Sequence, residues 1–109
     1  MADLGDERAA EARIDTRVDA TGTPVVVVSG ELDISNAATL ETTVESLAAG
    51  RPERLVFDLS GLRFMDSAGI AVLVGASTKV HSVHLRDPSP NVRRVIELTG
   101  LSPVLPIEP

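Results

Sequence analysis

The stretch LVFDLSGLRFMDSAGIAVLVGA, residues 55–76, contains the two patterns that decide the fold of this chain. Residues 53–61 overlap its start, and the large apolar side chains of Leu55, Val56, Phe57 and Leu59 among them predict a buried strand. Residues 68–76 are apolar around nearly the whole helical circumference, which predicts a helix covered on most sides. A carboxylate and a hydroxyl, Asp66 and Ser67, stand between the two. A strand followed directly by a helix is the unit from which parallel α/β sheets are built.

The residues before this stretch predict two more strands. Four consecutive valines, residues 25–28, favour a strand that is buried on both faces. A weaker apolar alternation begins at Ala12, and residues 19–24 have the composition of a turn. We therefore expect the first two strands to form a hairpin.

A helix is predicted between the second and third strands. Its apolar face, at helical spacing, consists of Ala37, Leu40, Val44 and Leu47. Either Ser35 or Asn36 can cap its start, and Gly50 fits its end.

Residues 79–87 predict a fourth strand, and the segment after it is the best-marked helix of the chain. Ser89 suits its N-cap, Pro90 its first turn and Gly100 its end. The expected inner face consists of Val92, Val95, Ile96 and Thr99. The three prolines of residues 101–109 allow at most a short edge strand.

The predicted fold is therefore a single α/β domain in the order β-β-α-β-α-β-α. Its sheet is mixed, largely parallel, has about four strands and is covered by helices. A length of 109 residues suits one domain. We expect residues 1–10 to form a charged flexible tail and residues 11–109 to form the domain.

Composition excludes several classes of function. The net charge of −6 disfavours nucleic acid and anionic membrane surfaces as partners. The chain has no cysteine, which excludes disulfides, thiolate catalysis and cysteine metal sites. It shows neither a signal peptide nor a window long enough to span a membrane, so a cytoplasmic location is expected.

Functional groups are expected where the parallel strands end. Two loops should open at that edge, GELDISN (residues 30–36) and SGLRFMDSAG (residues 60–69). If the strands are parallel, these loops are neighbours, and Asp33 and Ser67 lie close together although they are far apart in sequence.

Asp66 and Ser67 allow three interpretations. Either side chain can cap the following helix, which is a sufficient structural reason for a polar residue there. Catalysis is disfavoured, because a nucleophilic serine needs a base and the histidines, His81 and His84, belong to a later strand. The sequence has no nucleophile elbow, phosphate loop or metal cluster, so we expect no cofactor, and Asp58 is expected to be structural.

The third interpretation is modification. A phosphate on Ser67 would add nearly two negative charges at a helix N-terminus, where free N–H groups tolerate an anion. It would change the charge of a surface that already holds Asp66 and Asp33. A partner docked on that surface would meet repulsion and bulk.

Three segments closely resemble the STAS domain in its anti-sigma factor antagonist form. They are SGELDISNAATL (residues 29–40), DLSGLRFMDSAGIAVLV (residues 58–74) and SPNVRRVIELTGL (residues 89–101). The resemblance runs from about residue 25 to residue 101, and its most specific feature is D-S-x-G combined with an upstream G-E-L-D. Two departures stand out. Residues 75–84 are shorter than usual by about four residues, roughly one helical turn, and the usual C-terminal helix is missing.

The resemblance implies a non-enzymatic regulator that binds an anti-sigma factor and so frees a sigma factor for transcription. The anti-sigma factor is also a serine kinase; it phosphorylates Ser67 and thereby breaks the complex, which a phosphatase restores. Gly69 would allow close packing or leave room for the partner, and Met65 is either core or an exposed rim. The implied partner-binding residues are Asp33, Ile34, Ser35, Met65, Asp66, Ser67, Ala68 and Gly69. The simplest oligomeric state is a monomer. The alternative is a STAS scaffold, or a regulatory subunit of a signalling complex or transporter, without a Ser67 switch.

Overall fold

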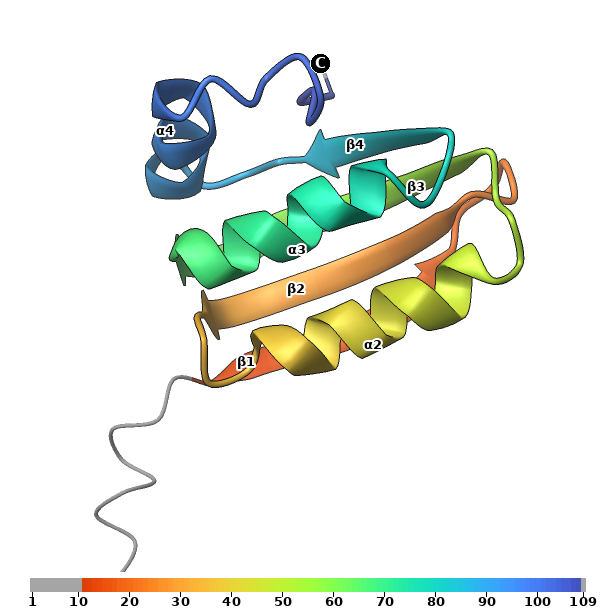
Figure 1. Ribbon diagram of the computed structural model, residues 1–109, viewed down its shortest axis with the longest axis horizontal. Helices are drawn as coiled ribbons and strands as arrows, with labels where there is room; N and C mark the ends of the chain where they lie inside the picture. The colour runs from red at the N-terminus through yellow and green to blue at the C-terminus, as the bar shows by residue number, and fades with distance from the viewer. Residues whose placement is uncertain (1–10, 109) are drawn as a thin grey trace, which may run out of the picture.

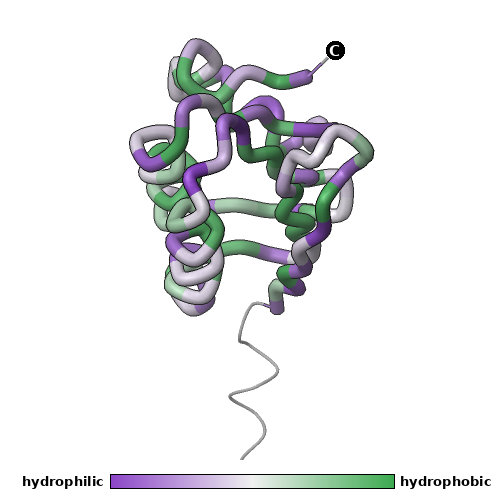
Figure 2. The backbone as a smooth tube through the Cα atoms, turned by 90° about the vertical axis from the view of Figure 1, so that its right-hand side faces the viewer, coloured by the Kyte–Doolittle hydropathy of each residue, from purple (hydrophilic) through white to green (hydrophobic). Residues whose placement is uncertain are grey.

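The computed structural model describes residues 11–108 and consists of two layers, a sheet and a set of helices (Figures 1 and 2). Its strands are β1 (Ala12–Val18), β2 (Pro24–Leu32), β3 (Arg54–Met65) and β4 (Ser82–Arg86), and its helices are α2 (Ala37–Ala48), α3 (Ser67–Ser77) and α4 (Pro90–Leu98). The order is the predicted β-β-α-β-α-β-α. The tail predicted at residues 1–10 lies outside the described residues.

The four strands lie in the sheet in the order β1-β2-β3-β4. β1 and β2 form the predicted antiparallel hairpin, whereas β2 and β3, and β3 and β4, are parallel. The Asp19 carboxylate closes the hairpin turn, because it accepts hydrogen bonds from the N–H groups of Thr21 and Thr23. The parallel pairing brings the carboxyl ends of β2 and β3 to the same edge of the sheet, where α2 and α3 begin.

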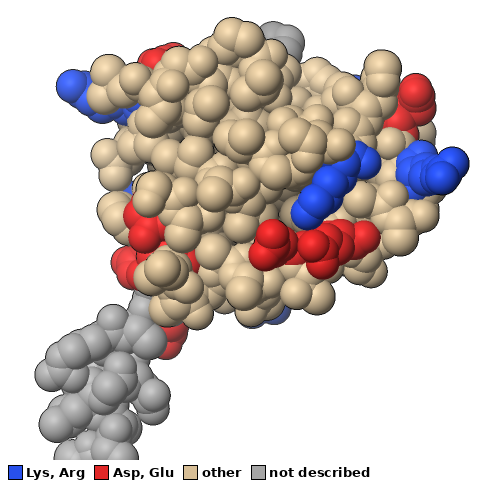
Figure 3. Space-filling model, viewed as in Figure 1, with Lys and Arg blue, Asp and Glu red and all other residues tan. Residues whose placement is uncertain are grey.

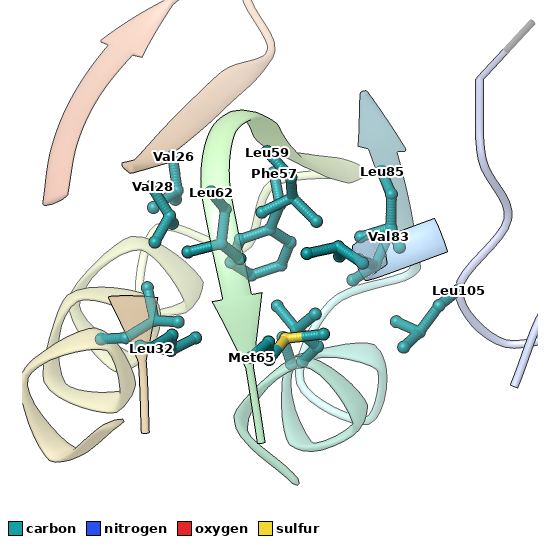
Figure 4. Packing of buried hydrophobic residues seen from close by; sticks show 14 of the residues in the cluster. Val26, Val28, Leu32, Phe57, Leu59, Leu62, Met65, Val83, Leu85 and Leu105 are labelled. Carbon is teal, nitrogen blue, oxygen red and sulfur yellow. The ribbon is translucent and has the colours of Figure 1, made fainter. Parts of the chain in front are cut away.

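The main core fills the space between the sheet and the helices (Figure 4). Phe57, in the first half of β3, is fully buried and is the largest side chain of this core. Leu73 and Ala76 of α3 and Val92 of α4 are buried in the same cluster. Burying each large side chain of this kind contributes about 1.5–3 kcal/mol, so the core holds α3 firmly against β3.

The opposite face of the sheet is closed largely by charged side chains. Val25 and Val56 are fully buried but lie outside the main cluster. Side chains two residues apart on a strand share a face, so Arg54 and Asp58 flank Val56 on β3, and Arg86 stands beside Asp58 on β4. This face of the sheet is therefore buried only around Val25 and Val56, whereas the described helices cover the other face.

Glu108 fastens the last described segment to this charged face. Its carboxylate accepts hydrogen bonds from Arg54 at 2.6 Å and from Arg86 at 2.8 Å. The hydrogen bond from Arg86 holds the pKa of Glu108 below its ordinary value. Ile107 forms a single parallel bridge with Leu85 of β4, in agreement with the predicted short edge strand.

The structure corrects the expected end of the third strand. β3 continues to Met65 rather than ending at Gly61, so most of the predicted 60–69 loop is strand. Register shifts between Val27 and Ser29 and between Gly30 and Glu31 allow the long strand to stay paired with β2. Ser60 and Gly61 resembled turn residues, but the irregular pairing accommodates them within the strand.

Two details at the helix ends also differ from expectation. After α2, the left-handed backbone position is taken by Arg51, with φ 53°, and not by Gly50. Thr99, predicted on the inner face of α4, is exposed because it is the C-cap of that helix. The other marks of α4 are confirmed, since Ser89 caps it and Gly100 adopts φ 72° just after it.

Candidate functional site

The ends of β2 and β3 are joined at the edge of the sheet where the sequence placed the site. Leu32 and Met65 are register partners, and the N–H of Asp66 donates a 3.1 Å hydrogen bond to the Leu32 carbonyl. The predicted neighbourhood of the two loops is confirmed. The connection from β3 to α3 is a single residue, Asp66, which fixes the start of the helix relative to both strands.

Asp66 is the N-cap of α3. Its Oδ1 accepts hydrogen bonds from the N–H of Ala68 at 2.8 Å and of Gly69 at 3.3 Å. Its extended backbone, with φ −101° and ψ −170°, is typical of an N-cap. The capping interpretation is therefore confirmed for the first residue of the pair.

Ser67 is left free by this arrangement. It is the first residue of α3, it is exposed, and within residues 11–108 its hydroxyl has no hydrogen-bond partner. Because Asp66 supplies the cap, the hydroxyl of Ser67 has no structural task there. The two adjacent polar residues thus have different roles, one structural and one available for chemistry.

Gly69 explains why the start of α3 lies so close to the strands. A Cβ at this buried position would meet Met65 Cγ at 2.7 Å and Leu32 Cδ2 at 2.8 Å. Met65 is itself only 3% exposed. Of the alternatives left open by the sequence, the structure places Met65 in the core and gives Gly69 a close-packing role. Both residues support the surface around Ser67 from beneath.

The turn after β2 forms the other half of this edge. The Asp33 carboxylate accepts hydrogen bonds from the N–H and the hydroxyl of Ser35, at 2.8 and 2.6 Å. The side-chain amide of Asn36 donates to the Glu31 carbonyl at 2.9 Å. These bonds hold the turn so that Ile34 points outward and is 83% exposed, which is unusual for an isoleucine.

The expected capping of α2 needs a correction. Asn36 occupies the N-cap position but makes no side-chain cap hydrogen bond. Its Oδ1 instead accepts from the N–H of Asp33. The Asp33 carbonyl in turn accepts from the N–H of Asn36 and of Ala37, at 3.1 and 2.9 Å. The first turn of α2 is thus closed largely by main-chain bonds, while the side chain of Asn36 shapes the turn.

A shallow groove of about 330 Å³ runs between α2 and α3 beside this edge. It is lined by Ile34, Ala37, Ala38, Glu41, Ala68, Ala71 and Val72. The alanines leave the floor open, and most of this face of the molecule carries no charge (Figure 3). The sequence did not predict the groove, because the groove depends on how two helices meet. Nor did the sequence predict that Phe64, at the end of β3, is 47% exposed.

The edge of the site is acidic. Within residues 11–108, none of Asp33, Asp66 and Glu41 forms an ion pair with a lysine or arginine. The neighbouring acidic residues do form ion pairs. Glu31 pairs with Arg63 and Glu45 pairs with Lys79, each at 3.5 Å. The carboxylates around Ser67 are therefore not neutralised by the described residues.

The other candidate groups are occupied elsewhere. Asp58 accepts hydrogen bonds from the N–H and hydroxyl of Ser60, as expected for a structural carboxylate. His84 Nδ1 accepts a hydrogen bond from Arg54 Nε at 3.1 Å on the charged face of the sheet.

The described part of the chain contains no cluster of His, Cys, Asp and Glu suited to a metal ion. None of the described helices is long and apolar enough to cross a bilayer.

Comparison with known proteins identifies the family. The family model of the STAS domain matches residues 11–109, so the chain belongs to the STAS domain family. Several curated relatives of the chain are named anti-sigma factor antagonists. It is 31% identical over 91 residues to the anti-sigma F factor antagonist of Paenibacillus polymyxa, a match that covers 79% of this chain and 78% of that protein.

A second curated relative and two solved structures are also similar to this chain. The chain is 37% identical over 65 residues, 60% of its length, to the anti-sigma-F factor antagonist RsfB of Mycobacterium tuberculosis; the match spans about half, 53%, of that protein. An anti-sigma factor antagonist from Mycobacterium paratuberculosis superposes with a TM-score of 0.83 at 33% identity, covering 91% of this chain and 86% of that one. Unphosphorylated SpoIIAA, at 22% identity and 0.76 with 89% of each chain covered, shows the same fold.

Proposed function

We propose that this chain is a non-enzymatic anti-sigma factor antagonist that binds an anti-sigma factor with serine kinase activity. Unphosphorylated, it would hold that partner and free a sigma factor for transcription; phosphorylated on Ser67, it would release it. The observation that carries this proposal is the exposed hydroxyl of Ser67, which has no partner among the described residues, at the first position of α3. The names of its relatives support it.

The docking surface in this proposal combines the 33–36 turn, the start of α3 and the groove between α2 and α3. Its exposed contacts are Ile34, Ser35 and Ser67. Asp33, Asp66 and Ala68 beside them are half-buried, and Met65 and Gly69 lie buried beneath. Ile34 is the main apolar anchor, because a largely exposed isoleucine gains most from being covered.

Phosphoryl transfer would be performed by the partner. The Ser67 oxygen attacks the γ-phosphorus of ATP; an O–P bond forms, the bond to the bridging oxygen of ADP breaks, and the hydroxyl proton passes to a base. No described residue contacts the Ser67 hydroxyl as such a base, so the kinase must supply it. The resulting phosphate ester is stable, and a phosphatase is needed to reverse the switch.

Binding measurements with three forms of the chain test the proposal. Wild type, Ser67→Ala and Ser67→Asp would be used to capture the partner, and the affinity of each would then be measured with the purified partner. Wild type and Ser67→Ala should bind, whereas Ser67→Asp should bind weakly. Ser46→Asp, which places the same charge at an exposed serine of α2, is the matched control and should bind normally.

Equal affinity of all three forms would remove the switch and favour the scaffold alternative, in which Ser67 has no regulatory role. For the antagonist we expect a monomer that acts in the cytoplasm without contacting nucleic acid or a membrane.

A further inference from the structure

The start of α3 offers few free donors to a phosphate. The N–H groups at a helix N-terminus are the usual ligands of a phosphate that lies there. In this helix two of them, from Ala68 and Gly69, already donate to Asp66 Oδ1. The N–H of Ile70 donates to the Asp66 carbonyl at 3.1 Å. Only the N–H of Ser67 itself remains without an acceptor among the described residues.

No described lysine or arginine is available to bind the phosphate in place of these N–H groups. Asp66 and Asp33 form no ion pair with a lysine or arginine of residues 11–108, and the side chain of Asp33 is held in its own turn by Ser35. Arg63, at the end of β3, is engaged with Glu31. A phosphate on Ser67 would thus face the Asp66 carboxylate at close range without a compensating positive charge.

We propose that Asp66 is a positioning residue for the phosphate: by occupying the two amides with a negative charge, it directs a phosphate on Ser67 away from the helix and into the docking surface. This inference rests on the proposed phosphorylation of Ser67. The Asp66 cap therefore sets how far phosphorylation lowers the affinity for the partner. A phosphate that folded back onto its own helix would present less charge and bulk to that partner.

Asp66 acts on the phosphate in two ways, by occupying the amides and by repelling the phosphate with its charge. Two substitutions of Asp66 separate these effects. Asp66→Ala opens the amides of Ala68 and Gly69, so the phosphate can bind them and turn back onto the helix. Asp66→Asn keeps an oxygen acceptor at the N-cap and removes only the charge. The first variant tests occupancy of the amides, and the second tests repulsion.

Nuclear magnetic resonance on protein carrying phosphoserine at position 67 gives a direct readout. The phosphoserine is introduced during translation, so no kinase or partner is required. Phosphorylation should leave the amide proton signals of Ala68 and Gly69 nearly unchanged in wild type and in Asp66→Asn. It should move them downfield in Asp66→Ala. Equal downfield movement in wild type and Asp66→Ala, or none in Asp66→Ala, would overturn the proposal.

The phosphorus signal tests the charge. Asp66 is the nearest carboxylate on the helix and Asp33 lies on the adjacent turn, so the second pKa of the phosphoserine should be lower in Asp66→Asn than in wild type, since removal of a like charge favours the dianion. An unchanged second pKa would show that the Asp66 charge does not act on the phosphate.

Partner affinity connects the proposal to function. The ratio of affinities for the unphosphorylated and phosphorylated chain should be smaller in Asp66→Ala than in wild type by about twofold to fivefold, the size of a charge interaction at a helix end. An equal ratio would contradict the positioning role. A ratio of one in wild type would instead refute the Ser67 switch, whereas the amide signals would still decide how Asp66 orients the phosphate.

Discussion

The N–H of Asp66 donates a hydrogen bond to the carbonyl of Leu32, and this 3.1 Å bond ties the start of α3 to the end of β2. It joins segments that are 34 residues apart, since 66 minus 32 is 34. Through this bond the turn that exposes Ile34 and the helix that exposes Ser67 become one surface. Any change that moves the start of α3 should therefore disturb both partner contact and phosphorylation.

Gly69→Ala should destabilise the fold by about 1–3 kcal/mol, because the new methyl would overlap Met65 and Leu32. The matched control is Gly75→Ala in the same helix, where a Cβ meets nothing within 4 Å. That control should stabilise the helix by about 0.5–1 kcal/mol. Urea unfolding of both variants measures the difference. A neutral Gly69→Ala would mean that the helix start is not closely packed.

Asp66→Ala should cost about 0.5–2 kcal/mol of stability, the range measured for loss of an N-cap. Asp66→Asn should cost less, because an asparagine oxygen can accept from the same two N–H groups. Thermal unfolding of the two variants at neutral pH compares them. Equal losses would show that charge rather than capping makes the contribution.

Ile34→Ala should weaken partner binding about fivefold or more while leaving stability nearly unchanged, because the side chain is 83% exposed in the free protein. Val18→Ala is the control. Val18 is 67% exposed and pairs with Pro24 at the opposite end of β2 from the docking surface. Calorimetric titration of each variant with the partner would check both. Equal effects from the two substitutions would argue against a localised docking surface.

Glu108 should give the chain an acid-sensitive contribution to stability. The hydrogen bond from Arg86 lowers the pKa of this carboxyl in the folded state relative to the ordinary value of 4.5. Its stabilising effect is therefore present above about pH 4.5 and is lost as the pH falls through the lowered folded value. Unfolding measured across this range should show a shallower acid limb for Glu108→Gln than for wild type. Glu53→Gln, at an exposed glutamate, should leave the limb unchanged.

Much of the fold could be predicted because its local patterns agree with its tertiary structure. The valine run of β2 predicts a buried strand, and the apolar residues 68–76 predict a buried helix. Ser89, Pro90 and Gly100 mark the two ends of α4. The end of β3 could not be predicted, because Ser60 and Gly61 resemble a turn. Only the register shifts against β2 explain how the strand continues.

The site was predicted in position but not in detail. The D-S pair and the parallel order of the strands were enough to bring the two loops together. Which residue caps the helix depends on backbone angles, and Asp66 rather than Ser67 has the extended conformation of an N-cap. The exposure of Ile34 and the groove beside it follow from how α2 and α3 meet, which no local pattern records.

The most direct test of the central claim is the affinity of the purified anti-sigma factor for the chain before and after phosphorylation of Ser67. Calorimetric titration of the two forms, with the modification site verified by mass spectrometry, would provide it. The proposed switch predicts tight binding of the unmodified chain and a loss of at least about tenfold, or 1.4 kcal/mol, on phosphorylation. Equal affinities of the two forms would contradict it.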